Sequence, residues 1–441
     1  MKTSKRAYAG KPVYIIDGAR TPFLRADGSG GQFSASDLAL TASRNLLIRQ
    51  PFEKEELDEI IFGCVMPGPD EANIARMITL RLGCDDRTTA WTVQRNCASG
   101  LQALDCAAQN ISQGRSDLIL AGGTEAMSLA PVLFNHAMVR WLTLWQKSRN
   151  FRARLKAITK FRPAMLAPVI GLLRGLSDPI AGLSMGQTAE NLAWRFGISR
   201  EDMDNYSVQS HQRLSAAQDA ERLQEITALY DRDGKQYNED NGLRRDSNLK
   251  SLSRLRPVFD RHFGNVTAGN SAQITDGAAC LILASEAAVK KHQLTPLGRI
   301  IDAQWAGLDP AQMGLGPVHA MAPIMKRHKL DSGDIDYWEI NEAFSAQVLA
   351  CLKAWSDTDY CTNELGLQQA FAEIPHERLN IDGGGISLGH PVGASGARVV
   401  LHLLRTLQQK QATRGMASLC IGGGQGGAMM IENMDDGADH D

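Results

Sequence analysis

The chain has 441 residues, a formal net charge of −2 and 43% hydrophobic residues. This length is enough for two or three domain-sized units with a large core. The balanced charge excludes a strongly basic nucleic-acid-binding protein, and the 22% of charged residues is ordinary for a soluble globular chain. We therefore expect a globular protein with no nucleic-acid partner.

The N-terminus and the cysteines indicate the compartment. The stretch MKTSKRAYAGKPVYIID passes from basic residues directly to a strand-like run, without the apolar segment of a signal peptide. No stretch offers about 18 uninterrupted apolar residues, so a transmembrane helix is not expected. The eight cysteines lie singly, with no C-x-x-C pair, which disfavours a metal site or a disulfide framework. We expect a cytoplasmic protein without a metal ion.

Strands and helices alternate along the chain. Predicted strands are 12–23, 59–68, 117–128, 298–309, 336–344 and a glycine-interrupted pair within 417–432, and predicted helices include 37–50 and 319–330. The strand at 336–344 leads into a further helix. Such alternation is typical of an α/β fold.

The two ends of the chain repeat a theme. Cys97 precedes the helical stretch SGLQALDCAAQNI, and His390 lies at the same kind of junction in GHPVGASGARVVLHLLRTL. Likewise LILAGGTEAM is echoed by SLCIGGGQGGAMM. Because both echoes occur in the same order, the sequence predicts an internal duplication.

The region 131–256, between the halves, has a different composition. Its first part, 131–182, has one acidic residue, Asp178, and the basic residues Arg140, Lys147, Arg149, Arg152, Arg154, Lys156, Lys160, Arg162 and Arg174. Helical spacing places on one face Phe134, Met138, Trp141, Leu142 and Trp145, followed by Phe151, Leu155 and Ile158. Residues 132–162 are therefore either an element that contacts an anionic membrane or a partner, or a helix packed on its own domain with a solvated basic face.

Four residues at glycine-rich or strand–helix junctions are candidates for chemistry. Cys97 precedes a helix, whose dipole and N–H groups favour a thiolate, although most free cysteines are inert core residues. His390 lies among glycines and is either a site residue or a helix cap. Cys420 ends a strand before three glycines, whose N–H groups can form an oxyanion hole. Asn341, in EINEAF, is either a helix N-cap or a site residue.

Two thiols and an imidazole form a nucleophile–base–acid set that needs no metal. This set suits acyl transfer through a thioester: one thiolate attacks a carbonyl, and the other thiol gives a proton to a carbanion leaving group.

The chain resembles the thiolases over nearly its whole length. The matching stretches, in the family's order, are GARTPF, NCASGLQA, AGGTEAMS, MGQTAEN, LRPVF, TAGNSAQITDGAA, EINEAF, GGGISLGHPVGASGAR and CIGGGQGGA. The long middle region is most similar to the β-subunits of fatty-acid-oxidation trifunctional complexes. The resemblance implies two βαβαβαββ halves in a five-layer α-β-α-β-α sandwich. The halves would be 1–130 with 257–290, and 291–441, and residues 131–256 would form an inserted loop domain.

The resemblance also implies the role of each candidate. Cys97 would be the acylated nucleophile, and His390 would activate it. Asn341 would fix a water that completes an oxyanion hole with His390. Cys420 would be the general acid/base for the acetyl-CoA carbanion, and the N–H groups of Cys97 and Gly422 would form a second oxyanion hole.

Coenzyme A would be a co-substrate across the loop domain, and no permanently bound cofactor is expected. By position, its contacts would be Leu176, Met185, Phe259, Ala268, Ser271, Ala343 and Phe344. Two positions depart from the family pattern: Ala272, with Ser271 just before it, stands where many thiolases have serine, and Ser184 stands where short-chain thiolases often have histidine.

The implied function is thiolytic cleavage of medium- or long-chain 3-ketoacyl-CoA in fatty acid β-oxidation. The alternative is an acetyl-CoA C-acetyltransferase that forms acetoacetyl-CoA, because both reactions use the same residues. Cys420 argues against a ketosynthase, and the intact NEAF motif argues against a non-enzymatic lipid carrier or scaffold. The family implies a homodimer or higher oligomer, and the subfamily implies a hydratase/dehydrogenase α-subunit as partner. With 132–162 on an anionic surface, the protein would be peripheral at the inner membrane.

Overall fold

A ten-stranded sheet runs through the whole molecule. In the computed structural model, which describes residues 8, 10–28 and 31–434, its strand order is β14-β15-β16-β13-β1-β12-β5-β3-β4, with β2 (Leu24–Arg25) paired to β12. Residues 1–7, which include the basic residues used in the prediction about a signal peptide, lie outside the described residues. Two halves of this path repeat the same strand order and meet where β1 pairs antiparallel with β13.

The N-terminal half has the order βαβαβαββ that the resemblance implies. Its elements are β1 (Val13–Arg20), α1 (Ala35–Ile48), β3 (Glu59–Gly63), α2 (Ile74–Leu82), β4 (Thr89–Val93), α3 (Ser99–Ser112), β5 (Leu118–Ala126) and β12 (Thr275–Ala284). A short helix, α10 (Glu286–His292), then leads to the second half. Strand β12 arrives only after the long insertion and pairs antiparallel with β5 over nine residue pairs, Asp276–Ala284 against Leu118–Ala126.

The C-terminal half repeats this order with one strand reduced. Its elements are β13 (Gly298–Gly307), α11 (Gly316–His328), β14 (Tyr337–Ile340), α12 (Ser345–Ser356), α13 (Thr358–Asn363), α14 (Gly385–Leu388), α15 (Ser395–Lys410), β15 (Arg414–Ile421) and β16 (Gln425–Asn433). In place of a third strand, Leu379 makes a single parallel bridge to Trp338 in β14. Leu379 takes the place that β4 has in the N-terminal half. The predicted duplication is therefore confirmed, with one strand reduced to a single bridge.

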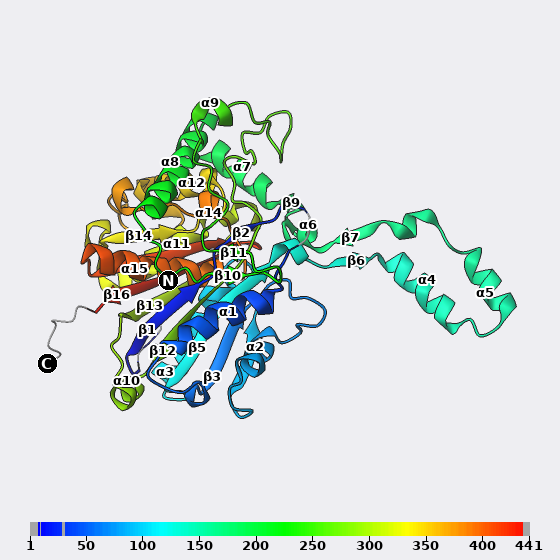
Figure 1. The fold of residues 1–441 in the computed structure, drawn as a ribbon. Coiled ribbons are helices and arrows are strands. Elements are labelled where there is room, and N and C mark those ends of the chain that lie inside the picture. The colour runs from blue at the N-terminus through cyan, green and yellow to red at the C-terminus, as the bar shows by residue number, and fades with distance from the viewer. Residues whose placement is uncertain (1–7, 9, 29–30, 435–441) are drawn as a thin grey trace.

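Helices and sheets form five layers (Figure 1). Helices α1 and α2 cover the outer face of the N-terminal half, and α11 and α12 cover the outer face of the C-terminal half. Helices α3 and α15 lie between the halves, where their apolar side chains share one core with both sets of strands. The predicted α-β-α-β-α sandwich is therefore confirmed.

Glycines let the two central helices approach each other closely. A Cβ added to Gly100 would lie 2.8 Å from the backbone nitrogen of Ala397 and 2.9 Å from the carbonyl oxygen of Gly393. A Cβ on Gly396 would lie 2.3 Å from the backbone nitrogen of Leu101. The N-termini of α3 and α15 thus lie together, which places Cys97 and His390 at the same end of the central layer.

The insertion begins with an arm that extends away from the layers (Figure 1). The arm consists of β6 (Val132–Phe134), α4 (His136–Lys147), α5 (Phe151–Ile158) and β7 (Pro168–Ile170), and β6 pairs with β7 at its base. Phe134, expected on the helical face, lies in β6 instead, because the helix begins only after its N-cap, Asn135.

The rest of the insertion returns to the body. Its elements are α6 (Gly171–Gly175), β8 (Ser177–Asp178), β9 (Leu183–Ser184), α7 (Met185–Arg195), α8 (Arg200–Asp219), β10 (Leu229–Tyr230), β11 (Gln236–Tyr237) and α9 (Leu249–Leu252). Helix α7 packs with α12 in the core of the C-terminal half, through Ala189, Leu192 and Ala193. The insertion therefore has a packed part near the site and a projecting part.

The close crossing of α3 and α15 predicts that Gly100→Ala destabilises the protein. Alanine normally favours a helix, but here its Cβ would contact the backbone of α15, so we expect a loss of about 1–3 kcal/mol in the free energy of unfolding. Thermal denaturation measures this loss. Gly333→Ala is the control, because no atom lies within 4 Å of a Cβ added there, and equal losses in the two variants would contradict the prediction.

Candidate active site

A tight turn presents Cys97 at the start of α3. Asn96 has a φ of 43°, a left-handed conformation that asparagine tolerates better than most residues. The Ser99 hydroxyl accepts a hydrogen bond from the Arg95 N–H at 2.8 Å and donates one to the Asn96 carbonyl at 2.7 Å. The Asn96 side-chain amide donates to the Gly422 carbonyl at 2.8 Å. This turn thereby joins the nucleophile candidate to the Gly422 loop.

Burial keeps the Cys97 thiol protonated in the resting site. Desolvation raises its pKa, whereas hydrogen bonds from the N–H groups of Gly422 and of Cys97 itself act to lower it. The N–H groups do favour a thiolate, as expected, but the pKa of Cys97 is raised and not lowered overall. The cost of burying a charged sulfur is larger than the stabilisation that the N–H groups give. Those same two N–H groups are the predicted second oxyanion hole, and both are close to the sulfur.

Cys420 lies near the end of β15, and Gly422 lies in the turn that connects β15 to β16. Cys420 is 1% exposed, and burial first, then the neighbouring Cys97, raise its pKa well above the usual range. The turn requires glycine at Gly423 and Gly424, whose φ angles are 91° and 74°. Cys420 is thus a neutral thiol beside Cys97, a protonation state that suits a proton donor.

His390 is held as a neutral base. Its Nδ1 lies 2.6 Å from the Ser395 hydroxyl oxygen, and that hydroxyl donates its one proton to the Pro391 carbonyl at 3.1 Å. Nδ1 must therefore carry the proton of its own bond, which leaves Nε2 as an acceptor. Burial and the charge of Arg398 lower the His390 pKa to about 4. Nε2 is buried without a hydrogen-bond partner among the described residues.

Asn341 also presents unpaired polar atoms. It is fully buried after β14, and neither its side-chain oxygen nor its nitrogen has a partner within the described part of the chain. The N-cap of α12 is Phe344, so the alternative reading of Asn341 as a helix cap is excluded. A buried amide without partners is costly in a folded protein unless a ligand uses it.

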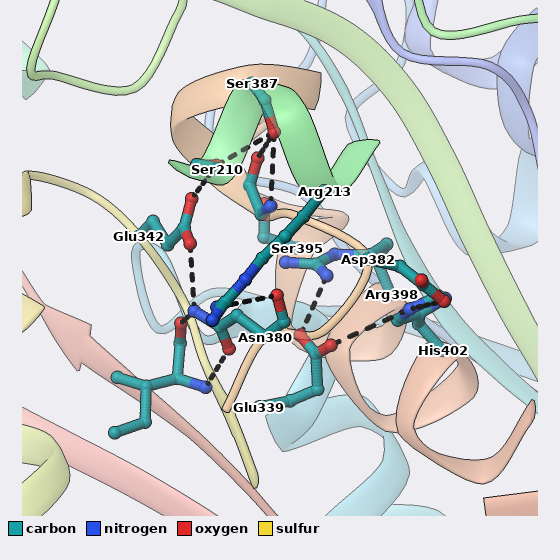
Figure 2. A network of polar contacts seen from close by, with 12 residues as sticks. Ser210, Arg213, Glu339, Glu342, Asn380, Asp382, Ser387, Ser395, Arg398 and His402 are labelled. Atoms are coloured by element: carbon teal, nitrogen blue, oxygen red, sulfur yellow. Dashed lines mark hydrogen bonds and ion pairs between the residues drawn. The ribbon is translucent and has the colours of Figure 1, made fainter. Parts of the chain in front are cut away.

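A network of buried polar groups holds the loops that carry Asn341 and His390 (Figure 2). The Glu342 carboxylate accepts bonds from Tyr206 at 2.9 Å, Ser210 at 2.7 Å and Asn380 at 3.0 Å. The Ser210 hydroxyl oxygen also lies 2.9 Å from that of Ser387, in α14 just before His390. Helix α8 of the insertion thereby supports both loops.

Charges on α15 extend this network (Figure 2). Arg398 pairs with Glu339 at 3.0 Å, and His402 lies 3.1 Å from Glu225 and 3.5 Å from Asp382. Burial lowers the His402 pKa, but the carboxylates of Asp382 and Glu225 outweigh it and raise the pKa to about 10. His402 is therefore a charged structural residue, in contrast to the neutral His390.

Sequence analysis missed Glu125, a fully buried carboxyl at the end of β5. It accepts hydrogen bonds from three backbone N–H groups, one of them that of Gly393 in the His390 loop. The signal was present in LILAGGTEAM, where one acidic residue interrupts an otherwise apolar and small-residue strand.

Most of the predicted coenzyme A contacts lie near one another. Met185 donates its backbone N–H to the Leu176 carbonyl at 2.9 Å, and its sulfur would lie 3.2 Å from a Cβ on Gly422. Phe259 and Phe344 meet edge to face, with ring centroids 6.0 Å apart. Ser271 bridges to Phe344, and the neighbouring residue, Ala272, donates to the carbonyl of the next predicted contact, Ala343, at 2.9 Å.

Two departures from the family pattern now have local explanations. The Ser271 hydroxyl donates to the Thr267 carbonyl at 2.7 Å, so it is engaged within its own turn. Ser184 is the N-cap of α7 and forms a capping box with Gln187. Ala268, the remaining predicted contact, is exposed on the same turn as Thr267. Within the described ranges, no group of three or more His, Cys, Asp or Glu side chains is placed to hold a metal ion.

Family models match nearly the whole chain. "Thiolase, N-terminal domain" matches residues 13–287, and "Thiolase, C-terminal domain" matches residues 294–433. The "3-ketoacyl-CoA thiolase" proteins of Yersinia pestis (strain Pestoides F) and Yersinia pseudotuberculosis serotype O:3 (strain YPIII) are each 36% identical over 426 residues, which are 96% of this chain and 97% of the relative.

Solved structures show the same fold. The human mitochondrial 3-ketoacyl-CoA thiolase in complex with CoA superimposes with a TM-score of 0.82 and 35% identity, covering 96% of this chain and 98% of that one. The Bacillus anthracis acetyl-CoA acetyltransferase gives a TM-score of 0.81 and 33% identity, covering 97% and 100%.

The duplicated fold, the family models and the named relatives define an enzyme of the acyltransferase class. The chain belongs to the thiolase family.

The tautomer of His390 predicts the effect of Ser395→Ala. Without the acceptor at Nδ1, the ring loses the bond that leaves Nε2 unprotonated, and we expect kcat to fall about three- to tenfold, the equivalent of one hydrogen bond. Steady-state kinetics measures this. Ser332→Ala is the matched control, because this buried hydroxyl also donates to a carbonyl, that of Ala372, and lies before β14. An equal fall in kcat in both variants would show that the bond between His390 and Ser395 does not set the tautomer needed for activity.

Proposed function

We propose that the protein cleaves medium- or long-chain 3-ketoacyl-CoA with CoA, giving acyl-CoA and acetyl-CoA, in fatty acid β-oxidation. The observation that carries this proposal is that Cys97, the candidate nucleophile, lies beside the neutral thiol of Cys420 and the N–H of Gly422. The same chain has a neutral buried imidazole at His390. Relatives named 3-ketoacyl-CoA thiolase support the substrate class.

In the first half-reaction, His390 Nε2 takes the Cys97 proton as the sulfur attacks the 3-keto carbon. The N–H groups of Cys97 and Gly422 stabilise the oxyanion that forms there, while His390 and a water fixed by Asn341 hold the thioester oxygen of the acetyl-CoA part. The bond between C2 and C3 then breaks, the acyl group stays on Cys97, and Cys420 gives its proton to the acetyl-CoA carbanion. A neutral, buried thiol suits this last step because its proton is not lost to water beforehand.

In the second half-reaction, CoA restores the enzyme. The Cys420 thiolate takes the proton of the CoA thiol, and the CoA sulfur attacks the acyl-Cys97 carbonyl. The Cys97 and Gly422 N–H groups stabilise the oxyanion, and Cys97 leaves as a thiol with the proton held by His390. Each residue returns to its starting protonation state. No permanently bound cofactor takes part in this scheme.

CoA contacts and domain organisation are further parts of this proposal. The cluster of Leu176, Met185, Phe259 and Phe344 beside Gly422 would hold pantetheine, and Ser271 would contribute its backbone because its hydroxyl is engaged. Residues 131–256 would act as one loop domain between the halves. The human structure with bound CoA supports CoA as the co-substrate.

A chain-length series tests the proposed reaction. We expect faster thiolysis of 3-ketodecanoyl-CoA and 3-ketohexadecanoyl-CoA than of acetoacetyl-CoA, and a loss of at least about a thousandfold in Cys97→Ala. Thioester absorbance measures the rates, and mass spectrometry locates the acyl group. A preference for acetoacetyl-CoA would favour the acetyl-CoA acetyltransferase reading, and full activity of Cys97→Ala would end the catalytic assignment.

The assembly is proposed from the family and from one sheet edge. Strand β4 ends the sheet, and its Trp91 is 37% exposed, so a second copy could extend the sheet there to give a homodimer. A hydratase/dehydrogenase α-subunit remains a prediction from the subfamily resemblance.

We further propose that residues 132–162, which form the part of the arm from β6 through α5, contact an anionic membrane surface. Its aromatic face is used internally: Trp141 donates to the Ala157 carbonyl at 2.8 Å and meets Phe161 edge to face. Helix α5 leaves the large apolar side chains of Phe151, Leu155 and Ile158 outside, which are 80%, 53% and 53% exposed.

These three side chains follow helical spacing on α5, next to the exposed Arg152, Arg154 and Lys156. An apolar ridge beside basic side chains matches the headgroup region of an anionic bilayer, where each basic residue adds about 1 kcal/mol. A helix folded only on its own domain would not leave this ridge in water. Among the described helices, none is long and apolar enough to cross a membrane.

Vesicle co-sedimentation tests the arm. We expect binding to phosphatidylcholine vesicles that contain phosphatidylglycerol, weaker binding at high salt, and loss of binding in the variant Phe151→Ser, Leu155→Ser, Ile158→Ser. Ile48→Ser, which changes an equally exposed apolar residue on α1, is the control. No binding by the wild type at low salt would reject the membrane proposal and leave a protein partner for the arm.

A further inference from the structure

Glu125 is a buried carboxylate bound by backbone rather than by a cation. Its Oε2 accepts the N–H groups of Val65 and Gly393, both at 3.0 Å, and its Oε1 accepts the N–H of Met66 at 2.9 Å. The Cys64 thiol lies 3.6 Å from Oε1. Among the described residues, no Lys, Arg or His forms an ion pair with this carboxylate.

The three N–H groups belong to two loops that border the nucleophile. Residues 64–66 follow β3, whose last residue, Gly63, packs against the backbone of Ser99 at the start of α3. Gly393 lies between His390 and α15, and its carbonyl oxygen would lie 1.9 Å from a Cβ on Gly123. Glu125 therefore joins one wall of the Cys97 turn to the loop that carries the imidazole.

The charge of Glu125 also reaches the nucleophile. Burial raises its own pKa to about 7, and the N–H groups of Met66 and Val65 oppose that shift. When ionised, the carboxylate contributes to the raised pKa of Cys97 and to that of Cys64. The titratable side chains that face Glu125 are thus Cys64, from the loop after β3, and Cys97, from the start of α3.

We propose that Glu125 is a positioning residue for acyl transfer, which holds the His390 loop in register with Cys97 through the Gly393 N–H. This inference rests on the proposed roles of Cys97 and His390. Glu125 touches neither substrate nor the reacting atoms; it acts by fixing where the base lies relative to the nucleophile. A small displacement of a catalytic group costs as much as about a hundredfold in rate.

A second carboxylate in the same region provides a matched comparison. Glu71 is also buried and accepts two backbone N–H groups, those of Ser36 at 2.9 Å and Gly68 at 3.1 Å. It ties the start of α1 to the loop after β3 but makes no bond to the His390 loop. Loss of Glu71 therefore reproduces the cost of a buried carboxylate without moving the base.

The variant Glu125→Gln tests the inference. An amide presents one oxygen and one NH₂ group, so at least one of the three backbone N–H groups loses its acceptor. We expect kcat to fall about tenfold to a hundredfold, with the KM for CoA within about twofold. Because a negative charge is removed near Cys97, the pH midpoint for alkylation of Cys97 by iodoacetamide should move to lower pH. Glu71→Gln should lower the melting temperature about as much as Glu125→Gln does, but it should leave kcat and the pH midpoint for alkylation of Cys97 unchanged.

Glu125→Asp separates position from charge. It keeps the carboxylate but shortens its reach, so kcat should fall while the alkylation midpoint stays near that of the wild type. Wild-type kcat in Glu125→Asp, or equal kcat losses in Glu125→Gln and Glu71→Gln, would overturn the inference. If Cys97→Ala were fully active, the proposed function would fail instead, so the two failures are distinguishable.

Hydrogen exchange of the wild-type protein gives a test that needs no variant. The amides of Val65, Met66 and Gly393 should be protected to a similar degree, because one side chain accepts all three. Rapid exchange of the Gly393 amide beside protected amides at 65 and 66 would show that the His390 loop moves independently of Glu125, and it would overturn the inference even if neither variant folds.

Discussion

The close contact between the N-termini of α3 and α15 is the constraint on which the site depends. Each helix belongs to one half of a duplicated fold, and each follows the loop that carries one reactive residue, Cys97 or His390. The two loops can approach only because Gly100 and Gly396 lack side chains at the crossing. The duplication thus places a helix N-terminus in an equivalent position in each half. The two glycines allow these N-termini, and the loops before them, to lie side by side.

The polar network behind the site explains why this crossing has a fixed geometry. Glu342 and Asn380 join α8 of the insertion to the Asn341 loop, while Glu225, also from the insertion, contacts both Arg20 in β1 and His402 in α15. Buried charges such as these are costly unless every partner is in place, so they select one arrangement of halves and insertion. The insertion, apart from its projecting arm, is therefore part of the scaffold that holds the loops carrying Asn341 and His390.

Apolar periodicity and glycine junctions were sufficient to predict an α/β fold, the duplication and the candidates Cys97, His390, Asn341 and Cys420, whereas the five-layer sandwich was implied only by the resemblance to the thiolases. What could not be predicted depended on contacts between distant segments. The pKa of Cys97 is raised because the folded chain desolvates the half-buried thiol, and only the folded arrangement shows that this desolvation exceeds the effect of the helix N-terminus. Phe134 has helical spacing with its neighbours, yet the pairing of β6 with β7 holds it in a strand. The role of Glu125 could not be predicted either, because its hydrogen bonds to the N–H groups of Val65 and Gly393 join segments that are distant in the sequence.

The protonation states of the resting site limit how the chemistry can begin. Both thiols have raised pKa values and the His390 pKa is about 4, so a proton has no tendency to pass from Cys97 to the imidazole before substrate is present. In the proposed mechanism, attack by Cys97 must therefore be coupled to proton transfer. A neutral thiol is also a poor target for oxidants and alkylating agents, whose reactivity follows the thiolate. If Cys97 is the nucleophile, as proposed, its raised pKa thus keeps it unreactive until substrate binds.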